Sequence, residues 1–319
     1  MAMPMQVDAS GDITAPLRLA ADLGGTTTRV ALVRGASVVE RREAPTPADA
    51  GPDAVVAQLA GLLEPWQSLC DRLCLAATGR VHAGRVSAVN RATMPGWEAY
   101  PLAAVLSAQS GLAVQLMNDA HAAAWGEYVY GAGRGCRDFA FVTVSTGIGA
   151  GLVVAGSLAL GARGMAGHIG FLPSAGPDAT ILEAEASGSG IARAASRAAG
   201  ESFTTSAVFA AAASGDALAQ SVIDAAVERL AQALVQLRWL VDPERVAIGG
   251  SVGLAHGYLP RLTAAVSRLE PAGPLALVPA ALGGDAGLLG AAAALAQGDA
   301  SSASASDPNA PPYRAPGSA

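Results

Sequence analysis

The sequence predicts an α/β protein made of two domains, and three observations support this. The chain has 319 residues, of which 51% are hydrophobic and 14% charged, so it can bury one large core or two smaller ones. Short apolar runs alternate with segments of helical length. A pattern of strand, glycine turn and strand occurs near the N-terminus and again near the middle of the chain, which suggests a duplicated unit.

The first unit begins at Leu17. Residues 17–23 form an apolar run that ends at two glycines, and residues 29–33 and 37–40 form two further runs. Apolar runs separated by glycine turns predict a meander of three strands. Residues 1–16, before it, are rich in Ser, Asp, Pro and Ala, and we expect them to be a disordered tail.

The second unit repeats this order. Residues 139–146, 152–155 and 156–158 are the three runs, and residues 147–151 are the glycine-rich turn between the first two. Asp22 aligns with Thr143 and Gly35 with Gly156, and each pair is separated by 121 residues. A common offset at both ends of the pattern is what a duplicated supersecondary unit would produce.

Helices and strands are expected to alternate elsewhere. Helices are predicted at 52–64 and 101–109, and strands at 73–77, 114–117 and 246–248. A long helix that ends at Asp242-Pro243 is predicted from apolar residues three or four positions apart, namely Leu218, Val222, Ala226, Leu230, Ala233 and Leu237.

Charge and composition exclude several classes of protein. The net charge is −6 and the isoelectric point is near 5.2, which argues against nucleic-acid binding and favours a small ligand. The chain has no long uninterrupted apolar run and no secretion-like N-terminus, so we expect a cytoplasmic protein without a membrane partner. Its three cysteines, Cys70, Cys74 and Cys136, give no disulfide framework.

Lysine is absent, because all 20 basic residues are arginine. A Walker A motif requires a lysine, so the P-loop class of nucleotide-binding proteins is excluded. If the protein uses ATP, backbone amides, hydroxyls, arginine or metal must hold its phosphates.

Two glycine turns could provide such groups. Asp22-Leu-Gly-Gly-Thr-Thr-Thr28 offers close backbone approach, hydroxyl donors and a carboxylate suited to Mg²⁺, and Ser145-Thr-Gly-Ile-Gly-Ala-Gly151 offers a second set. Either could be an ordinary turn, but the pair suggests ATP held between two domains that close on it. A third turn, Gly249-Gly-Ser-Val-Gly253, could lie under a flat base or simply join a strand to a helix.

Asn118 and Asp119 end a predicted strand and open a predicted helix. Asp119 could cap the helix, but kinases also need a carboxylate near the accepting hydroxyl, at the edge of the sheet where ligands bind. The helix N-terminus would favour the ionised form that accepts a proton. Further along, the glycine-rich segment 164–171 carries His168, and Glu183 follows it; a lone His of this kind is more often structural.

Together these motifs resemble the ROK family of sugar kinases, over about residues 17–296. The resembling segments are Asp22-Leu-Gly-Gly-Thr-Thr, Met117-Asn-Asp-Ala-His-Ala-Ala-Ala-Trp125 and Thr143-Val-Ser-Thr-Gly-Ile-Gly-Ala-Gly151. Within the family, Gly167-His-Ile-Gly170, Glu183-Ala-Glu-Ala-Ser-Gly-Ser-Gly-Ile191, the segment from Gly249 to Tyr258 and Gly284-Asp-Ala-Gly-Leu-Leu-Gly290 are most similar to bacterial N-acetylmannosamine kinases.

The resemblance implies two ribonuclease-H-like domains of the actin-like ATPase type, at residues 17–117 and 118–284. A helix at 285–296 would complete the first domain, and residues 297–319 would be a disordered tail. It also implies a homodimer, with ATP and sugar in the cleft between the domains.

Roles for single residues follow from the same resemblance. Asp119 would be the catalytic base, and Asp22 would position Mg²⁺, through water. The sugar would be held by Gly79, Asn90, Asn118, His168 and Glu183. ATP would be held by Asp22, Gly24, Gly25, Thr26, Thr27, Thr146, Gly147, Gly149 and Gly250.

The chain departs from the family at its structural zinc. Relatives commonly bind zinc through a His and three Cys, but here Phe171 stands at the His position and residues 172–181 contain no Cys. A tetrahedral site needs these ligands, so we predict that the protein binds no zinc. In many relatives the His at this position also contacts the sugar. Because Phe171 replaces it here, the sugar specificity has to be tested with several sugars.

These features predict ATP-dependent phosphorylation of N-acetylmannosamine at its 6-hydroxyl. A ROK-type glucokinase or other hexose kinase is the alternative. A non-catalytic sugar sensor is a third reading, because the family also contains transcriptional repressors. Those carry an N-terminal helix-turn-helix, for which the 16 residues before the first strand are too few.

Overall fold

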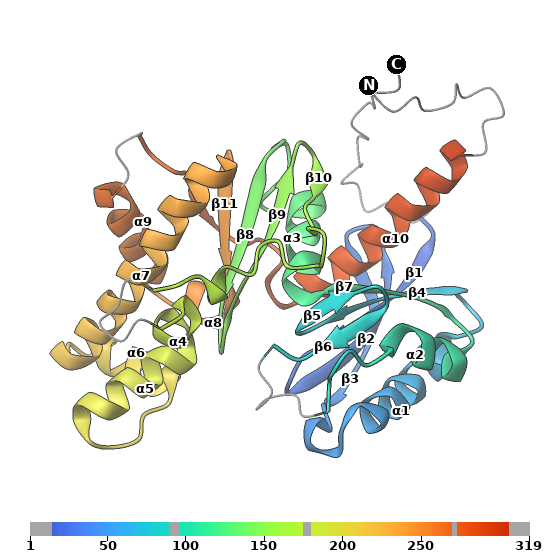
Figure 1. Cartoon of the computed structure of the whole chain (residues 1–319), viewed down its shortest axis with the longest axis horizontal. Helices are drawn as coiled ribbons and strands as arrows, with labels where there is room; N and C mark the ends of the chain where they lie inside the picture. Colours follow the sequence, from blue (N-terminus) through green and yellow to red (C-terminus); the bar gives the residue numbers. More distant parts are fainter. Residues whose placement is uncertain (1–14, 90–95, 175–179, 270–272, 306–319) are drawn as a thin grey trace.

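Two five-stranded sheets form the framework of the protein (Figure 1). The structure, a computed structural model, describes residues 15–89, 96–174, 180–269 and 273–305, with side chains described up to residue 296. The predicted α/β class is confirmed. The predicted tails fall largely outside the described residues.

The first sheet has the order β3-β2-β1-β4-β7. Strands β1, β2 and β3 are antiparallel, and β4 and β7 run parallel to β1. Its strands are β1 (Leu17–Leu23), β2 (Thr27–Arg34), β3 (Ser37–Pro45), β4 (Arg72–Ala77) and β7 (Ala113–Asn118). One face packs on helices α1 (Pro52–Leu63) and α2 (Leu102–Ser110) around a core that contains Leu19, Leu59 and Leu106.

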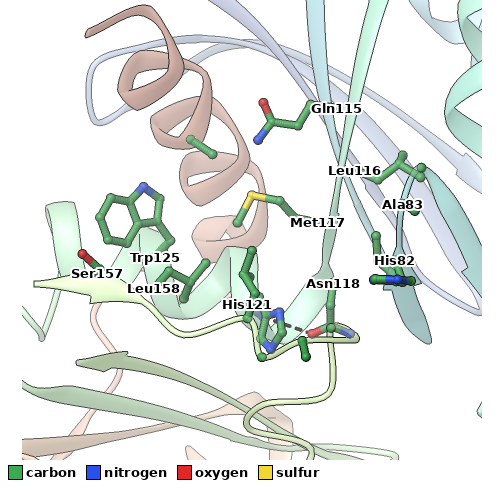
Figure 2. Close-up of a pocket in the computed structure, with 17 residues that line it drawn as sticks. His82, Ala83, Gln115, Leu116, Met117, Asn118, His121, Trp125, Ser157 and Leu158 are labelled. Carbon is green, nitrogen blue, oxygen red and sulfur yellow. Dashed lines mark hydrogen bonds between the residues drawn. The ribbon is translucent and has the colours of Figure 1, made fainter. Parts of the chain in front are cut away.

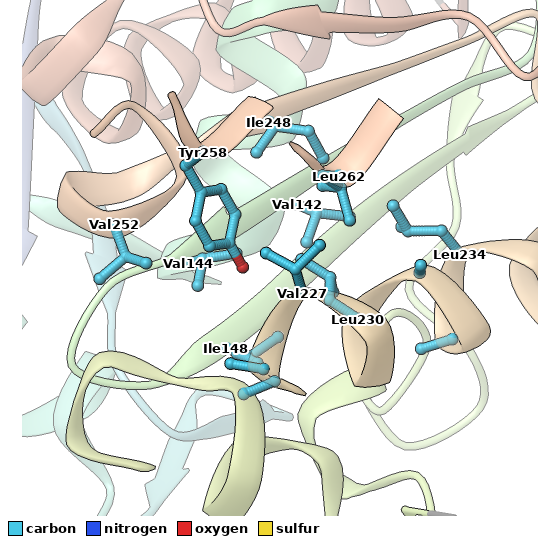
Figure 3. Packing of buried hydrophobic residues seen from close by; sticks show 14 of the residues in the cluster. Val142, Val144, Ile148, Val227, Leu230, Leu234, Ile248, Val252, Tyr258 and Leu262 are labelled. Atoms are coloured by element: carbon cyan, nitrogen blue, oxygen red, sulfur yellow. The ribbon is translucent and has the colours of Figure 1, made fainter. Parts of the chain in front are cut away.

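The second sheet has the equivalent order, β10-β9-β8-β11-β12, with the same strand directions. Its strands are β8 (Phe139–Val144), β9 (Ile148–Val154), β10 (Ser157–Leu158), β11 (Arg245–Gly249) and β12 (Leu277–Pro279). One face packs on helices α4 (Leu182–Ala186), α5 (Gly188–Ala199), α6 (Thr205–Ala213), α7 (Ala217–Val241), α8 (Gly250–Gly253) and α9 (Tyr258–Leu269). Figure 3 shows Val142, Leu230 and Ile248 in this core.

The matching strand orders are what duplication of one unit would produce. The strand pairing across the two turns nevertheless differs by one residue. Leu23 pairs with Thr28, although β2 already begins at Thr27, whereas Val144 pairs with Ile148, the first residue of β9. The first turn therefore has one more residue between its paired positions than the second.

Helices α3 (Asp119–Tyr130) and α10 (Ala286–Ala305) lie between the two sheets, as Figure 1 shows. Helix α3 packs on β8 and β9, α10 packs on β1 and β4, and the two helices pack on each other. Their backbones meet at Gly290, where an added Cβ would lie 1.7 Å from the carbonyl oxygen of Ala122. The last described helix is thus joined to the first sheet, far from it in sequence.

Several boundaries differ from the sequence predictions. Helix α10 continues to Ala305, past the predicted end at residue 296, so residues 297–305 of the predicted disordered tail are helical instead. The hairpin of β5 (Arg80–His82) and β6 (Arg85–Ser87) and the short helices η1 (Ala48–Ala50), η2 (Glu64–Trp66), η3 (Ile169–Phe171) and η4 (Gly283–Asp285) were not predicted. Elements this short carry no detectable periodicity.

Helix α7 has a wider buried face than its predicted apolar stripe. Leu218, at the start of that stripe, is 38% exposed, whereas Ile223, Val227 and Leu234 are buried. The reason is that α4, α5, α6 and α9 all pack against α7, so its buried arc is set by several neighbours.

No single helix in the described part of the chain is long and apolar enough to cross a membrane. Helices α6 and α7 together meet that length and composition, but they are bent by 116° relative to each other.

Candidate active site

The predicted site residues gather where the parallel strands of the first sheet end. Asp22 lies near the end of β1, Thr78 follows β4, and Asn118 ends β7. Ligands of α/β proteins bind at this carboxyl edge of parallel strands. The edge faces α3, whose first residue is Asp119.

Asn118, not Asp119, caps helix α3. The Oδ1 atom of Asn118 accepts a hydrogen bond from the backbone N–H of His121 at 3.1 Å, while Asn118 Nδ2 donates to Asp119 Oδ1 and to the carbonyl oxygen of Gly79, both at 2.9 Å. One buried amide thus satisfies the helix end and orients the neighbouring carboxylate. This leaves the Asp119 carboxylate in the first turn of α3, free of the capping role.

The environment of Asp119 raises the pKa of its carboxyl group above the ordinary value. Burial is the main cause, and it outweighs the opposing effects of hydrogen bonds from Ala120 N–H and Thr78 and of the nearby His168. We expected the helix N-terminus to favour the ionised form of Asp119. Burial favours the protonated form instead, and it is the stronger of the two effects. A carboxylate with a raised pKa is a better proton acceptor once it is ionised.

Asp22 lies close enough to Asp119 for the two charges to interact. Burial and the Asp119 charge raise the pKa of Asp22 to about 6, and Arg29 partly offsets them. The Nη1 atom of Arg29 lies 3.6 Å from Asp22 Oδ2, and the Asp22 side chain is 21% exposed. Two neighbouring carboxylates with one weak cationic contact form a site that a divalent cation would stabilise.

His168 and His121 form a second group beside Asp119. Their rings lie edge to face with centroids 5.8 Å apart, and His121 Nε2 lies 2.6 Å from the carbonyl oxygen of Ala166. Burial lowers the pKa of His121. Within the described residues, His168 Nδ1 is buried without a hydrogen-bond partner, so this nitrogen is available to a ligand.

Glu183 lies at the second glycine turn. Its Oε2 atom accepts a hydrogen bond from the backbone N–H of Ile148 at 2.9 Å. Thr146 is exposed and Gly147 partly exposed, so this turn is open to solvent. Gly149 instead lies in β9, where an added Cβ would be 3.0 Å from the Cβ of Ala120, which gives it a packing role, and its contact with ATP stays a prediction.

The first glycine turn is fixed by Thr46. The Thr46 hydroxyl donates to the carbonyl oxygen of Gly24 at 2.8 Å, and Thr46 N–H donates to that of Thr26 at 2.9 Å. Gly25 and Thr26 are exposed, and Thr27 begins β2. Gly250 begins α8 beside the end of β8. Asn90 lies outside the described residues.

Sequence reasoning missed Thr78, Thr46 and His121. Thr78 hydrogen-bonds to Asp119, Thr46 braces the first turn, and His121 contacts His168. Only Thr78 could have been found from sequence, because it directly follows a predicted strand at the edge where ligands bind. The other two act through contacts between segments distant in sequence.

Metal binding at this site fits Mg²⁺ better than zinc. Asp22 offers the oxygen ligand that magnesium prefers, alone or through water. Among the described residues, no group of three or more His, Cys, Asp and Glu is placed to hold a metal ion, and Phe171 is partly exposed beside His168. The absence of zinc stays a prediction.

An open cavity of about 660 Å³ adjoins this site and shares Asn118 and His121 with it (Figure 2). It is bounded by the β5–β6 hairpin, β7, α3 and the segment after β10. Asn118 and His121 contribute to its wall, together with Gln115, Met117, Trp125 and Leu158. Asn118 and His121 therefore belong both to the wall of this cavity and to the group around Asp119.

Two sheets of the same order, joined by two central helices and carrying a glycine turn each, define a protein of the actin-like ATPase fold. Residues 18–298 match the model of the ROK family. The chain belongs to the ROK family.

The relatives include N-acetylmannosamine kinases. The chain is 40% identical to the N-acetylmannosamine kinase of Citrobacter koseri over 291 residues, which cover 88% of this chain and 99% of that protein. It is 42% identical to the bifunctional enzyme NanE/NanK of Brucella melitensis over 90% of this chain, and it spans only 55% of that protein.

Solved structures give the same fold. The ROK hexokinase from Thermus thermophilus superimposes with a TM-score of 0.77 at 30% identity, covering 89% of this chain and 99% of that one. A ROK family glucokinase from Streptomyces griseus, in complex with glucose and AMPPNP, has a TM-score of 0.76 at 26% identity, covering 88% and 99%.

Proposed function

We propose that this protein transfers the γ-phosphate of ATP to the 6-hydroxyl of N-acetylmannosamine, giving N-acetylmannosamine 6-phosphate and ADP. The observation that carries the proposal is the setting of Asp119, a carboxylate with a raised pKa that is held by Asn118, Ala120 and Thr78. The Citrobacter koseri relative, matched over nearly its whole length, supports the choice of sugar.

Asp119 would accept the proton of the 6-hydroxyl as the new oxygen–phosphorus bond forms. Its orientation is set before the sugar arrives, because Asn118 and Ala120 N–H hold one of its oxygens. His168 would use its unpartnered Nδ1 to hold a sugar hydroxyl, as would Glu183, Asn118, the Gly79 segment and Asn90. Such positioning aligns the hydroxyl with the phosphate.

ATP would lie between the two glycine turns. Gly25, Thr26 and Thr146, which are exposed, and Gly147, which is partly exposed, would hold its phosphates through their backbone, and Gly250 would adjoin the adenosine. Asp22 would hold Mg²⁺, which would neutralise part of the phosphate charge. Closure of the two domains would exclude water from the reacting groups.

A coupled assay of ADP release tests this function directly. N-acetylmannosamine, glucose, N-acetylglucosamine and mannose would be compared at equal concentrations, with Mg²⁺ present or removed by EDTA. We expect the highest kcat/KM for N-acetylmannosamine and no turnover in EDTA. A higher kcat/KM for glucose would transfer the assignment to the second candidate, a glucokinase-like enzyme.

One observation favours that second candidate. The Thermus thermophilus and Streptomyces griseus structures that share this fold are a hexokinase and a glucokinase. The Phe171 ring, 6.4 Å from that of His168, does not distinguish the two candidates, because a phenyl ring offers a hydrogen bond to neither sugar. The sugar panel distinguishes the two candidates.

We also propose that the enzyme forms a homodimer, on the basis of its family. Trp239 and Leu240, 65% and 79% exposed at the end of α7, offer apolar surface to such a contact. Size-exclusion chromatography with light scattering would measure the mass, and a monomer at micromolar concentration would contradict the proposal.

A further inference from the structure

Glu183 contacts the second glycine turn at two adjacent residues, Gly147 and Ile148. Besides the 2.9 Å hydrogen bond from Ile148 N–H, its Oε2 atom would lie 2.6 Å from a Cβ built on Gly147. The carboxylate therefore covers the turn at a point where only glycine leaves room for it. Glu183 belongs to α4, which follows the turn by more than thirty residues, so the contact is purely tertiary.

The same short helix is tied to the segment that carries His168. Leu182 N–H donates to the carbonyl oxygen of Leu172 at 2.9 Å, directly after η3, and an added Cβ at Gly170 would lie 3.4 Å from the Cβ of Glu183. Just beyond α4, Gly188 at the start of α5 donates its backbone N–H to the carbonyl oxygen of Ser145 at 2.7 Å. The chain from α4 to the start of α5 thus bridges the His168 segment and the second glycine turn.

Resting on the function proposed above, we propose that Glu183 is a positioning residue that makes sugar binding and ATP binding cooperative. Of its two carboxylate oxygens, Oε2 holds Ile148 N–H, and the carboxylate has further acceptor sites for a sugar hydroxyl. A sugar bound to this carboxylate restricts its rotamers and thereby orders the amides that receive the phosphates. By thermodynamic linkage, ATP must then tighten sugar binding by the same factor.

The test measures this coupling directly rather than activity alone. Isothermal titration calorimetry would give the Kd of AMPPNP with Mg²⁺, in the absence and presence of saturating N-acetylmannosamine. For the unmodified protein we expect the sugar to lower that Kd by about tenfold, within the usual range of coupling between sites. The coupling ratio is the Kd of AMPPNP without the sugar divided by its Kd with the sugar. A purely structural role for Glu183 would change the melting temperature but not this ratio.

Two substitutions at Glu183 separate the effect of side-chain length from the effect of charge. Glu183→Asp retains the charge but is one methylene shorter, so it should lose contact with Ile148 N–H and reduce the ratio to below about twofold. Glu183→Gln retains one oxygen for Ile148 N–H and should keep an intermediate ratio, which remains measurable if the Asp variant does not fold. Glu185→Gln is the matched control, because Glu185 lies on the same helix but pairs with Arg229 and Ser174.

Each result has a defined meaning. The inference is overturned if Glu183→Asp, or Glu183→Gln where the Asp variant does not fold, retains the ratio of the unmodified protein, or if Glu185→Gln loses the ratio equally. An unmodified protein that neither binds nor phosphorylates N-acetylmannosamine would instead contradict the proposed function. The two failures are therefore distinguishable.

Discussion

The side-chain amide of Asn118 donates a hydrogen bond of 2.9 Å to the carboxylate of Asp119, the residue that follows it. The carbonyl oxygen of the same Asn118 side chain caps helix α3. A single buried side chain therefore sets both the start of the helix and the direction of the proposed base. This arrangement leads to the first two predictions.

Asp119→Asn should reduce kcat by about 10²- to 10⁴-fold, because an amide cannot accept the hydroxyl proton. The similar size of Asn should leave the Kd of N-acetylmannosamine within about threefold of its original value, since no sugar contact beyond that oxygen is removed. Steady-state kinetics and calorimetry would measure the two effects. Residual activity near that of the unmodified protein would disprove the assigned base.

Asn118→Ser and Asn118→Ala should separate the cap from the orientation of Asp119. Serine can still accept the hydrogen bond from His121 N–H, whereas alanine cannot and should cost about 1 kcal/mol more stability. Both variants lose the donors to Asp119 and Gly79, so both should lose activity. Thermal melts should therefore separate the two variants while kcat falls in both, and equal melting temperatures would contradict the capping role.

Asp22→Asn should stabilise the protein while it removes activity. Burial and Asp119 raise the Asp22 pKa from 3.8 to about 6, which corresponds to at most about 3 kcal/mol of destabilisation in the ionised folded state. This penalty is absent below the unfolded pKa, where the group is protonated in both states. It is complete above the folded pKa.

The unmodified protein and the Asp22→Asn variant should therefore differ in melting temperature at neutral pH and have similar melting temperatures near pH 4. Differential scanning calorimetry without Mg²⁺ at both pH values would measure this. A difference that persists unchanged at the acidic pH would show that the Asp22 charge is not its source.

Gly250→Ala should weaken ATP binding more than sugar binding. Gly250 has a φ of +83°, and its added Cβ would lie 2.3 Å from the carbonyl oxygen of Val144, so α8 must move away from β8. Gly257→Ala is the matched control, because Gly257 has a φ of +78° but no atom within 4 Å of the added Cβ. Each substitution should lower the stability by about 1–2 kcal/mol, because alanine disfavours the left-handed backbone. Only Gly250→Ala should also raise the KM of ATP.

Protein purified without added metal should contain no stoichiometric zinc, because Phe171 and residues 172–181 provide none of the ligands that relatives use. Inductively coupled plasma mass spectrometry would measure the metal content. A zinc-to-protein ratio near one would overturn this prediction and would point to ligands elsewhere in the chain.

Much of the fold followed from local patterns. The strands around the two glycine turns, the helix that opens at Asp119 and the strand before Gly249 all carry period, length and turn signals within a few residues. The β5–β6 hairpin and the exact buried face of α7 did not follow, because the first is too short for a period and the second depends on four neighbouring helices.

The candidate site divides in the same way. Asp22, Asn118 and Asp119 could be proposed from sequence because each lies at the end of an apolar run, which is where parallel strands present ligand-binding groups. Thr46 could not be proposed from sequence, because its hydroxyl contacts Gly24, a residue of the first turn that lies twenty-two positions earlier in the chain.

The sequence by itself determined the α/β class, the duplicated units, the exclusion of a lysine-based phosphate loop and the identity of the proposed base. These depend on composition and on patterns of a few residues. Only the tertiary structure decided that α10 packs on α3 between the sheets, that Glu183 holds Ile148, and that Asp22 and Asp119 share an environment that raises the pKa of both. Contacts between distant segments, and the burial that shifts a pKa, exist only after the sheets and helices have packed.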